Sequence, residues 1–284
     1  MGSSGYDRRF ERACSSLASS QGADLKVWRT ALMGLVGLLV VVFALLWFLP
    51  ARWALPWLHA RLNGVRLQDV SGLVWDGRAG QVLSARGENL GVLQWQLSRQ
   101  ALLGDNRLQV DLHGPRIDFT GHMAGKQATE ATWTDVQMRI DLDVLGAGPV
   151  LLGGVPRGTL RATAGTIELR GGWPSTLDTQ VQWQGAVLLT RQANLQLGNL
   201  QADLHAMNGV IEGHLQDDGR GPLRIDGRMQ LSPLARRFIA EAAPRGRQPA
   251  LQQWLAGFGT VDADGVTHID YSGGLAAAIR GKQP

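Results

Sequence analysis

From residue 65 onward, apolar and polar residues alternate along the chain with a period of two. In residues 223–231 the apolar set is Leu223, Ile225, Met229 and Leu231, and charged or amide side chains stand between them. Such alternation is typical of antiparallel strands with one apolar and one solvated face. Turn signals rich in Gly, Asn and Asp recur at short intervals between the runs. Residues 65–284 are therefore predicted to form an all-β domain of ten or more strands.

Three segments depart from this alternation and favour helices. Pro233–Ala243 and Pro249–Phe258 contain helix formers with a proline near the first turn, which predicts two short helices near the C-terminus. Residues 50–64 read as a short amphipathic helix that ends at Asn63-Gly64.

The longest apolar run, residues 30–49, contains no charged side chain. A helix of this length spans about 30 Å, the thickness of the hydrocarbon core of a bilayer. The run exceeds the apolar core of a signal peptide, so residues 28–49 are predicted to be a retained transmembrane helix. Residues 1–27 read as a disordered tail. Basic residues are equally frequent on both flanks, so the charge distribution does not orient the helix.

Composition narrows the classes of function. Charged residues make up 18% of the chain, and half of the net charge of +4 lies in the first 29 residues. The body of the protein is therefore close to neutral, which argues against a nucleic-acid partner. The sequence contains one cysteine, Cys14, which precedes the apolar run. Without a second cysteine no internal disulfide can form.

No nucleophile elbow, P-loop or metal-binding signature occurs in the sequence, so we expect neither an enzyme nor a cofactor. One polar cluster invites comparison with a metal or proton-transfer site. If Asn208-Gly209 closes a two-residue hairpin, His205 lies opposite Glu212 and Asp203 lies opposite His214. All four side chains then share one face. Because a register slip of one residue would disperse them, we favour ordinary cross-strand pairing on a solvated face.

A short box after residue 64 carries a family signal. Gly72, Val74, Trp75 and Gly77 form a G-x-V-W-x-G pattern, which is followed by L-G-V-L-Q-W-Q-L at residues 90–97 and by a Trp-containing segment from residue 251. In this order, after one N-terminal apolar run, the motifs resemble the protein N family of the type II secretion system. The usual W-S-G of that family is W-D-G here. We expect the box to be structural, with the Trp75 indole in the core.

The resemblance implies a bitopic inner-membrane protein of a Gram-negative secretion machine, with its β-domain in the periplasm. It further implies the inner-membrane platform proteins as partners, with the outer-membrane secretin as an additional candidate, and no enzymatic activity. The family is also similar to long β-sheet proteins of the AsmA type, whose curved sheet offers an apolar concave face to lipid.

The sequence leaves open what lies against the apolar face of the strands. In a sandwich a second layer would bury Leu223, Ile225, Met229 and Leu231, whereas in an open sheet the same residues would line a groove that lipid can reach. Glycines on the apolar side favour a curved, open sheet, because glycine permits the bends that curvature requires. These glycines are Gly198, Gly213 and Gly227. Two functions follow: a structural assembly factor and a lipid-handling domain.

Overall fold

The computed structural model describes residues 33–41, 45, 47–53, 64–127, 129–145 and 153–274. The chain divides into two compact units, Met1–Leu49 and Pro50–Pro284. In the first unit, residues 33–41 are helical. No helix within the described ranges is long and apolar enough to cross a membrane. Positions 28–32, 42–44 and 46 of the predicted transmembrane helix lie outside the described residues, as do the tail 1–27 and residues 54–63 of the expected amphipathic helix.

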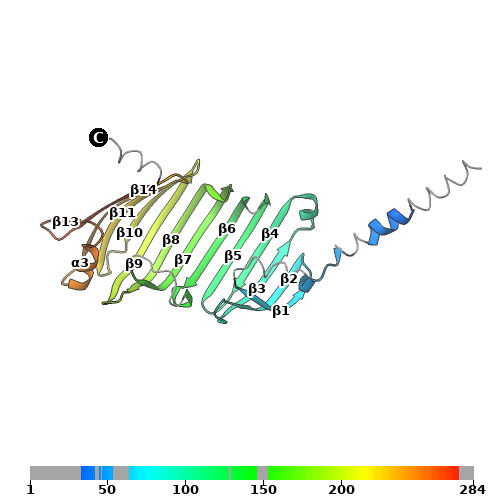
Figure 1. The fold of residues 1–284 in the computed structure, drawn as a ribbon, viewed down its shortest axis with the longest axis horizontal. Helices are drawn as coiled ribbons and strands as arrows, with labels where there is room; N and C mark the ends of the chain where they lie inside the picture. The colour runs from blue at the N-terminus through cyan, green and yellow to red at the C-terminus, as the bar shows by residue number, and fades with distance from the viewer. Residues whose placement is uncertain are drawn as a thin grey trace, which may run out of the picture. The chain divides into compact units, whose positions relative to one another are not determined.

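The second unit contains one antiparallel sheet of fourteen strands, which confirms the predicted all-β domain (Figure 1). The first seven strands are β1 (Arg66–Gly72), β2 (Asp76–Leu83), β3 (Asn89–Leu97), β4 (Asn106–His113), β5 (Ile117–Gln127), β6 (Glu130–Asp141) and β7 (Val155–Arg170). The other seven are β8 (Trp173–Leu189), β9 (Asn194–Met207), β10 (Val210–Asp217), β11 (Leu223–Leu231), β12 (Ala235–Pro244), β13 (Thr260–Val261) and β14 (Thr267–Gly274).

Sequence order and spatial order coincide from β1 to β12. At the far end β14 lies between β12 and β13. The short helices η1 (Arg99–Leu103), η2 (Leu142–Leu145) and α3 (Pro249–Leu255) lie in connections between strands. Since all strands in the described part of the chain belong to one sheet, the sandwich alternative is wrong and the open-sheet alternative holds.

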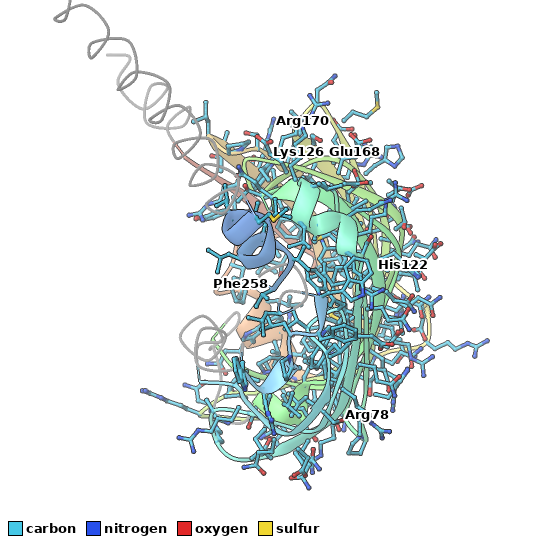
Figure 2. The ribbon with its side chains drawn as sticks, turned by 90° about the vertical axis from the view of Figure 1, so that its right-hand side faces the viewer. Arg78, His122, Lys126, Glu168, Arg170 and Phe258 are labelled. Carbon is cyan, nitrogen blue, oxygen red and sulfur yellow. The ribbon has the colours of Figure 1, made fainter. Side chains whose placement is uncertain are left out.

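The sheet curves into an arc, which Figure 2 shows in cross-section. Arg78 and His122 lie on its outer side, and Phe258 lies on its inner side. We call these the convex and the concave face. Strands of sixteen and seventeen residues, β7 and β8, form the middle of the sheet.

The predicted helix at Pro233–Ala243 is wrong, because this segment forms β12. Its helix formers conceal an alternation in which Phe238, Ala240 and Ala242 share one face. β12 pairs at nine of its ten positions with β11 and at eight positions with β14. Pairing on both edges outweighs the modest helix propensity of these residues. The other predicted helix, Pro249–Phe258, is confirmed as α3, although it ends at Leu255.

The largest buried cluster lies where α3 packs on the sheet. Leu251 and Leu255 of α3 meet buried side chains from four strands. These strand residues are Ala186, Leu188, Leu195, Leu197, Leu200, Leu223 and Ala242. Two smaller clusters lie on β1–β2 around Ala79 and on β8–β10 around Ala206. The core is therefore distributed along the sheet, with its thickest part under α3.

Candidate binding surfaces of the sheet

A continuous row of apolar residues crosses the concave face from one end of the sheet to the other. Each residue of this row is the register partner of the next, and none is polar. The row consists of Val70, Ala79, Leu93, Leu112, Phe119, Met138, Ala162, Val181, Ala202, Leu215, Gly227, Ala240 and Ile269. With neighbouring strands about 4.8 Å apart, it extends for about 58 Å. We call it the apolar row.

The adjacent row, one residue further along each strand, points to the convex face and is polar in every strand except β12. It consists of Ser71, Arg78, Gln94, Asp111, Thr120, Gln137, Thr163, Gln180, Asp203, His214, Arg228, Ile239 and Asp270. The two rows show that a single sheet separates an apolar concave face from a hydrated convex face.

The concave face is hollowed between β7 and β14. This hollow has a volume of about 510 Å³, within the range of about 300–1,000 Å³ that is usual for ligand sites. Its floor includes Val181, Ala202, Leu215 and Ile225, and Phe258 lines it after the end of α3. We call it the concave hollow.

Two tryptophans near the concave hollow are held in place by a hydrogen bond or by a contact with another aromatic ring. The Trp183 indole N–H donates to the Arg157 carbonyl at 2.9 Å, so the ring lines the hollow without an unpaired polar atom. Trp254 contacts Phe258 edge to face, with ring centroids 4.8 Å apart. These contacts fix aromatic side chains around the hollow.

The four expected lipid-facing residues all lie on the apolar side of β11, but their surroundings differ. Leu223 is 2% exposed because it packs in the cluster under α3. Ile225 is half-buried and lines the concave hollow. Met229 lies beside Gly213, where an added Cβ would come within 2.6 Å of its Cγ. Leu231 packs against the cluster around Ala206. Of the four, Leu223 and Ile225 line the hollow.

The G-x-V-W-x-G box forms the turn between β1 and β2. Gly72 pairs with Gly77 across the two strands, and Gly72 has a positive φ of 86°. The Trp95 ring of β3 covers Gly77, where an added Cβ would approach the ring to 2.3 Å. The Trp95 indole N–H also donates to the Val74 carbonyl at 3.0 Å. Trp95 therefore contacts the turn at two positions, Gly77 and Val74.

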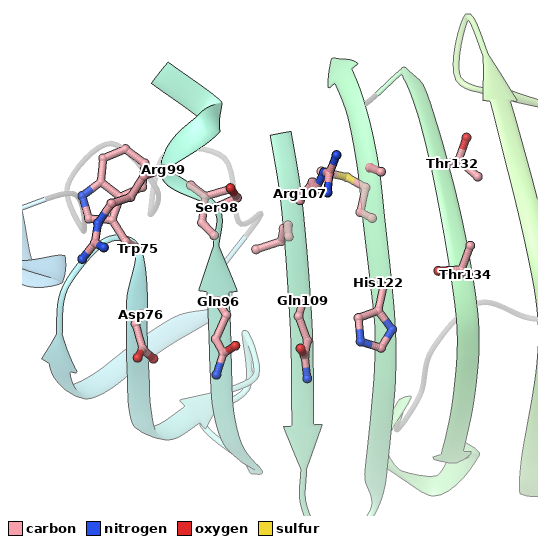
Figure 3. Close-up of a pocket in the computed structure, with 14 residues that line it drawn as sticks. Trp75, Asp76, Gln96, Ser98, Arg99, Arg107, Gln109, His122, Thr132 and Thr134 are labelled. Atoms are coloured by element: carbon pink, nitrogen blue, oxygen red, sulfur yellow. The ribbon is translucent and has the colours of Figure 1, made fainter. Parts of the chain in front are cut away.

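Trp75 itself is buried, with an exposed fraction of 8%. Its carbonyl accepts a hydrogen bond from the Leu97 N–H at 2.7 Å, which joins the turn to the end of β3. Trp75 and Arg99 line one end of a second hollow, shown in Figure 3. Along the rest of this hollow Asp76, Gln96, Gln109, His122 and Thr134 project from successive strands. Its polar residues belong to the convex side.

The polar cluster has the predicted register, because Glu212 is the partner of His205 and His214 is the partner of Asp203. The two histidines, however, approach carboxylates on other strands. His205 Nδ1 lies 3.6 Å from Asp178 Oδ1, and His214 Nε2 lies 3.2 Å from Asp226 Oδ1. All these pairs are exposed on the convex face, and no group of three or more potential metal ligands occurs in the described part of the chain. The geometry fits cross-strand pairing on a solvated surface.

One carboxylate, Asp217, is nearly buried, with 6% of its side chain exposed. Burial acts to raise its pKa, but the hydrogen bond from Arg245 and those from the N–H groups of Ile225 and Gly219 outweigh this and lower the pKa. The Arg245 Nη1 lies 2.7 Å from Asp217 Oδ2 and also donates to the carbonyls of Gly221 and Leu223. This network fastens the β10–β11 turn to the end of β12.

The sequence profile described as type II secretion system (T2SS), protein N, matches residues 63–270. The chain belongs to the protein N family of the type II secretion system. The match covers the sheet from before β1 into β14, so the family region and the curved sheet coincide. No curated protein and no solved structure matches the chain.

Membership of the protein N family makes this protein a component of the type II secretion system with a role in protein transport at the cell envelope. Within the family region, the G-x-V-W-x-G box and the stretch at residues 90–97 form one structural unit. Trp95 in this stretch contacts Gly77 and Val74 of the box. Sequence reasoning singled out both motifs but not this contact. It also did not place Phe258 beside the concave hollow, because that position depends on how distant strands meet.

Proposed function

We propose that this protein is a bitopic inner-membrane component of the type II secretion system, with a structural or assembly role in the export of folded proteins across the outer membrane. The family match over residues 63–270 is the observation that carries the proposal. The domain boundaries proposed here are a cytoplasmic tail at 1–27, a transmembrane helix at 28–49, a juxtamembrane helix at 50–64 and the periplasmic domain at 65–284.

The form of the sheet supports an assembly role rather than catalysis. Among the described residues the polar side chains are spread along the convex face, whereas catalysis would require several polar groups to converge in a dry pocket. Within the described residues β1 lies at one edge of the sheet and the two-residue β13 covers only the beginning of β14 at the other. Sheet edges of this kind can pair with strands of other proteins. The proposed partners are the inner-membrane platform proteins and the secretin.

The topology is tested by fusing alkaline phosphatase after Pro284 and, in a parallel strain, a reporter that is active only in the cytoplasm. We expect the phosphatase to be active and the cytoplasmic reporter to be silent. The reverse result would place the sheet on the other side of the membrane.

The assembly role is tested by deleting the gene and measuring both secretion of a type II substrate and co-purification of the platform proteins. We expect secretion to fall while the remaining platform proteins lose part of their association. Undiminished secretion together with unchanged association would contradict the proposal.

The open concave face favours a second function, the handling of lipid in the periplasm. The apolar row and the concave hollow offer a hydrocarbon environment that no second sheet covers among the described residues. In this case the protein would bind membrane lipid while it acts in the secretion system. No cofactor is part of either proposal.

A further inference from the structure

We propose that the concave hollow binds one acyl chain of an anionic phospholipid, with the headgroup beside Arg236. This inference rests on the second function above and specifies its site and its lipid class.

The lining suits hydrocarbon and little else. Apart from Gln201, the floor and walls consist of aliphatic and aromatic residues from β7 to β14 and Phe258. The Trp183 N–H is occupied by the Arg157 carbonyl, and the Tyr271 hydroxyl accepts a hydrogen bond from Arg236 at 2.8 Å. A polar ligand would therefore lose its own hydration without gaining partners on the floor.

Arg236 places a positive charge on the same face as this apolar floor. Its guanidinium lies 5.3 Å from the centre of the Tyr271 ring, and an added Cβ at Gly273 would come within 2.8 Å of its Nε. Tyr271 and Gly273 share the concave face of β14, so the arginine side chain lies across that face. No carboxylate among the described residues forms an ion pair with Arg236, although its side chain is exposed.

The other ionic group near the hollow does not repel an anion. Asp217 follows Leu215 on β10, but its carboxylate is neutralised by Arg245. No described residue that lines the hollow is charged, and Arg236 beside it supplies a positive charge that complements a phosphate.

The floor is long enough to hold one acyl chain. The hollow extends from Leu160 of β7 to Tyr271 of β14, which is six strand spacings or about 29 Å. An acyl chain of a phospholipid covers half of the hydrocarbon core, about 15 Å. One chain can lie along the floor with its headgroup near Arg236.

The experiment uses the full chain with a photoreactive phenylalanine derivative at one position, reconstituted into vesicles of phosphatidylglycerol or of phosphatidylcholine with the same acyl chains. The derivative replaces Val181 or, in a second protein, Ile225, both of which line the hollow. Gln180 on the convex face is the matched control, and Met138 reports on the apolar row outside the hollow. Adducts are identified by mass spectrometry, and circular dichroism shows that each protein is folded.

We expect lipid adducts at Val181 and Ile225 but not at Gln180, with phosphatidylglycerol preferred about fivefold, as one cation near a headgroup allows. Arg236→Gln should reduce this preference to near one. Arg237→Gln is the control, because Arg237 lies on the convex face and should leave the preference unchanged.

Four results would overturn the proposal or a part of it. Adducts at Met138 but at neither hollow position would leave lipid handling in place and refute this site, whereas adducts at none of the concave positions would refute both. A crosslink from Val181 and Ile225 to another segment of the chain would show that protein fills the hollow. Equal preference for phosphatidylglycerol before and after Arg236→Gln would remove the headgroup assignment.

Discussion

At the scale of single residues, the close packing of the turn at residues 72–77 explains the two glycines of the G-x-V-W-x-G box. Gly77 must lack a side chain because the Trp95 ring lies on it, and Gly72 adopts a positive φ that other residues rarely adopt. The sequence indicated that these residues are structural. It could not indicate the contact, because irregular register between β2 and β3 shifts which residues meet.

Replacing Gly77 with alanine should destabilise the protein by about 1–3 kcal/mol, since the new methyl group must displace a packed indole. Gly165 on β7 is a matched control, because an added Cβ there meets no atom within 4 Å. Thermal unfolding of Gly77→Ala and Gly165→Ala would measure the difference. Equal melting temperatures would contradict the proposed packing.

Trp75→Ala should cost about 3–5 kcal/mol through the cavity that it leaves, and should lower the amount of protein in the membrane. Trp53→Ala, at a side chain that is 64% exposed, should leave stability unchanged. A Trp75→Ala protein with an unchanged melting temperature that fails to support secretion would instead identify Trp75 as a partner contact.

The Asp217–Arg245 pair predicts a dependence of stability on pH. Because folding lowers the pKa of Asp217, its contribution is present above the unfolded pKa of about 3.9 and is lost as the pH falls through the folded value. Asp217→Asn should therefore lower the melting temperature at neutral pH, and its difference from wild type should shrink below about pH 4. Asp226→Asn, at an exposed carboxylate, should change little at either pH. A constant difference across this range would contradict the assignment.

At the scale of elements, the alternation of apolar and polar residues identified most strands. It could not predict the strand β12, and it could not distinguish an open sheet from a sandwich. Helix formers in Ala235–Pro244 suggested a helix, and only pairing with β11 and β14 makes this segment a strand. Alternation is also the same in a sandwich and in an open sheet, because each strand has one apolar face in both. The hairpin at Asn208-Gly209, in contrast, was predictable with its register, since a two-residue turn fixes the pairing.

Helix α3 should stabilise its end of the sheet through its buried face. Leu251 is 2% exposed in the cluster with Leu197 and Leu223, so Leu251→Ala should cost about 2–5 kcal/mol. The neighbouring Gln252 is exposed, and Gln252→Ala should have almost no effect on denaturant unfolding. Equal unfolding midpoints for the two variants would show that α3 contributes little to the core.

At the scale of the whole molecule, the sheet is one curved layer with a concave face that is apolar over about 58 Å. Leu223 and Ile225 of β11 both lie on this face, but Leu223 is buried under α3 whereas Ile225 lines the concave hollow. Leu223→Asp should unfold the protein because the carboxylate would be buried under α3, whereas Ile225→Asp should leave a folded protein that no longer binds lipid. Circular dichroism and lipid crosslinking separate the two effects. Unfolding by Ile225→Asp would indicate a sealed core.

The accessibility of the concave face is the claim on which the account depends most, and cysteine labelling measures it directly. In a Cys14→Ser background, single cysteines would replace Met138 and Val181 of the apolar row, Gln180 of the convex face and the fully buried Leu188. We expect maleimide to label cysteines at Met138 and Val181 at rates within about tenfold of that at Gln180, while the cysteine at Leu188 stays protected in the folded, delipidated protein. Protection of Met138 and Val181 equal to that of Leu188 would show that another layer covers the face, and would contradict the open sheet.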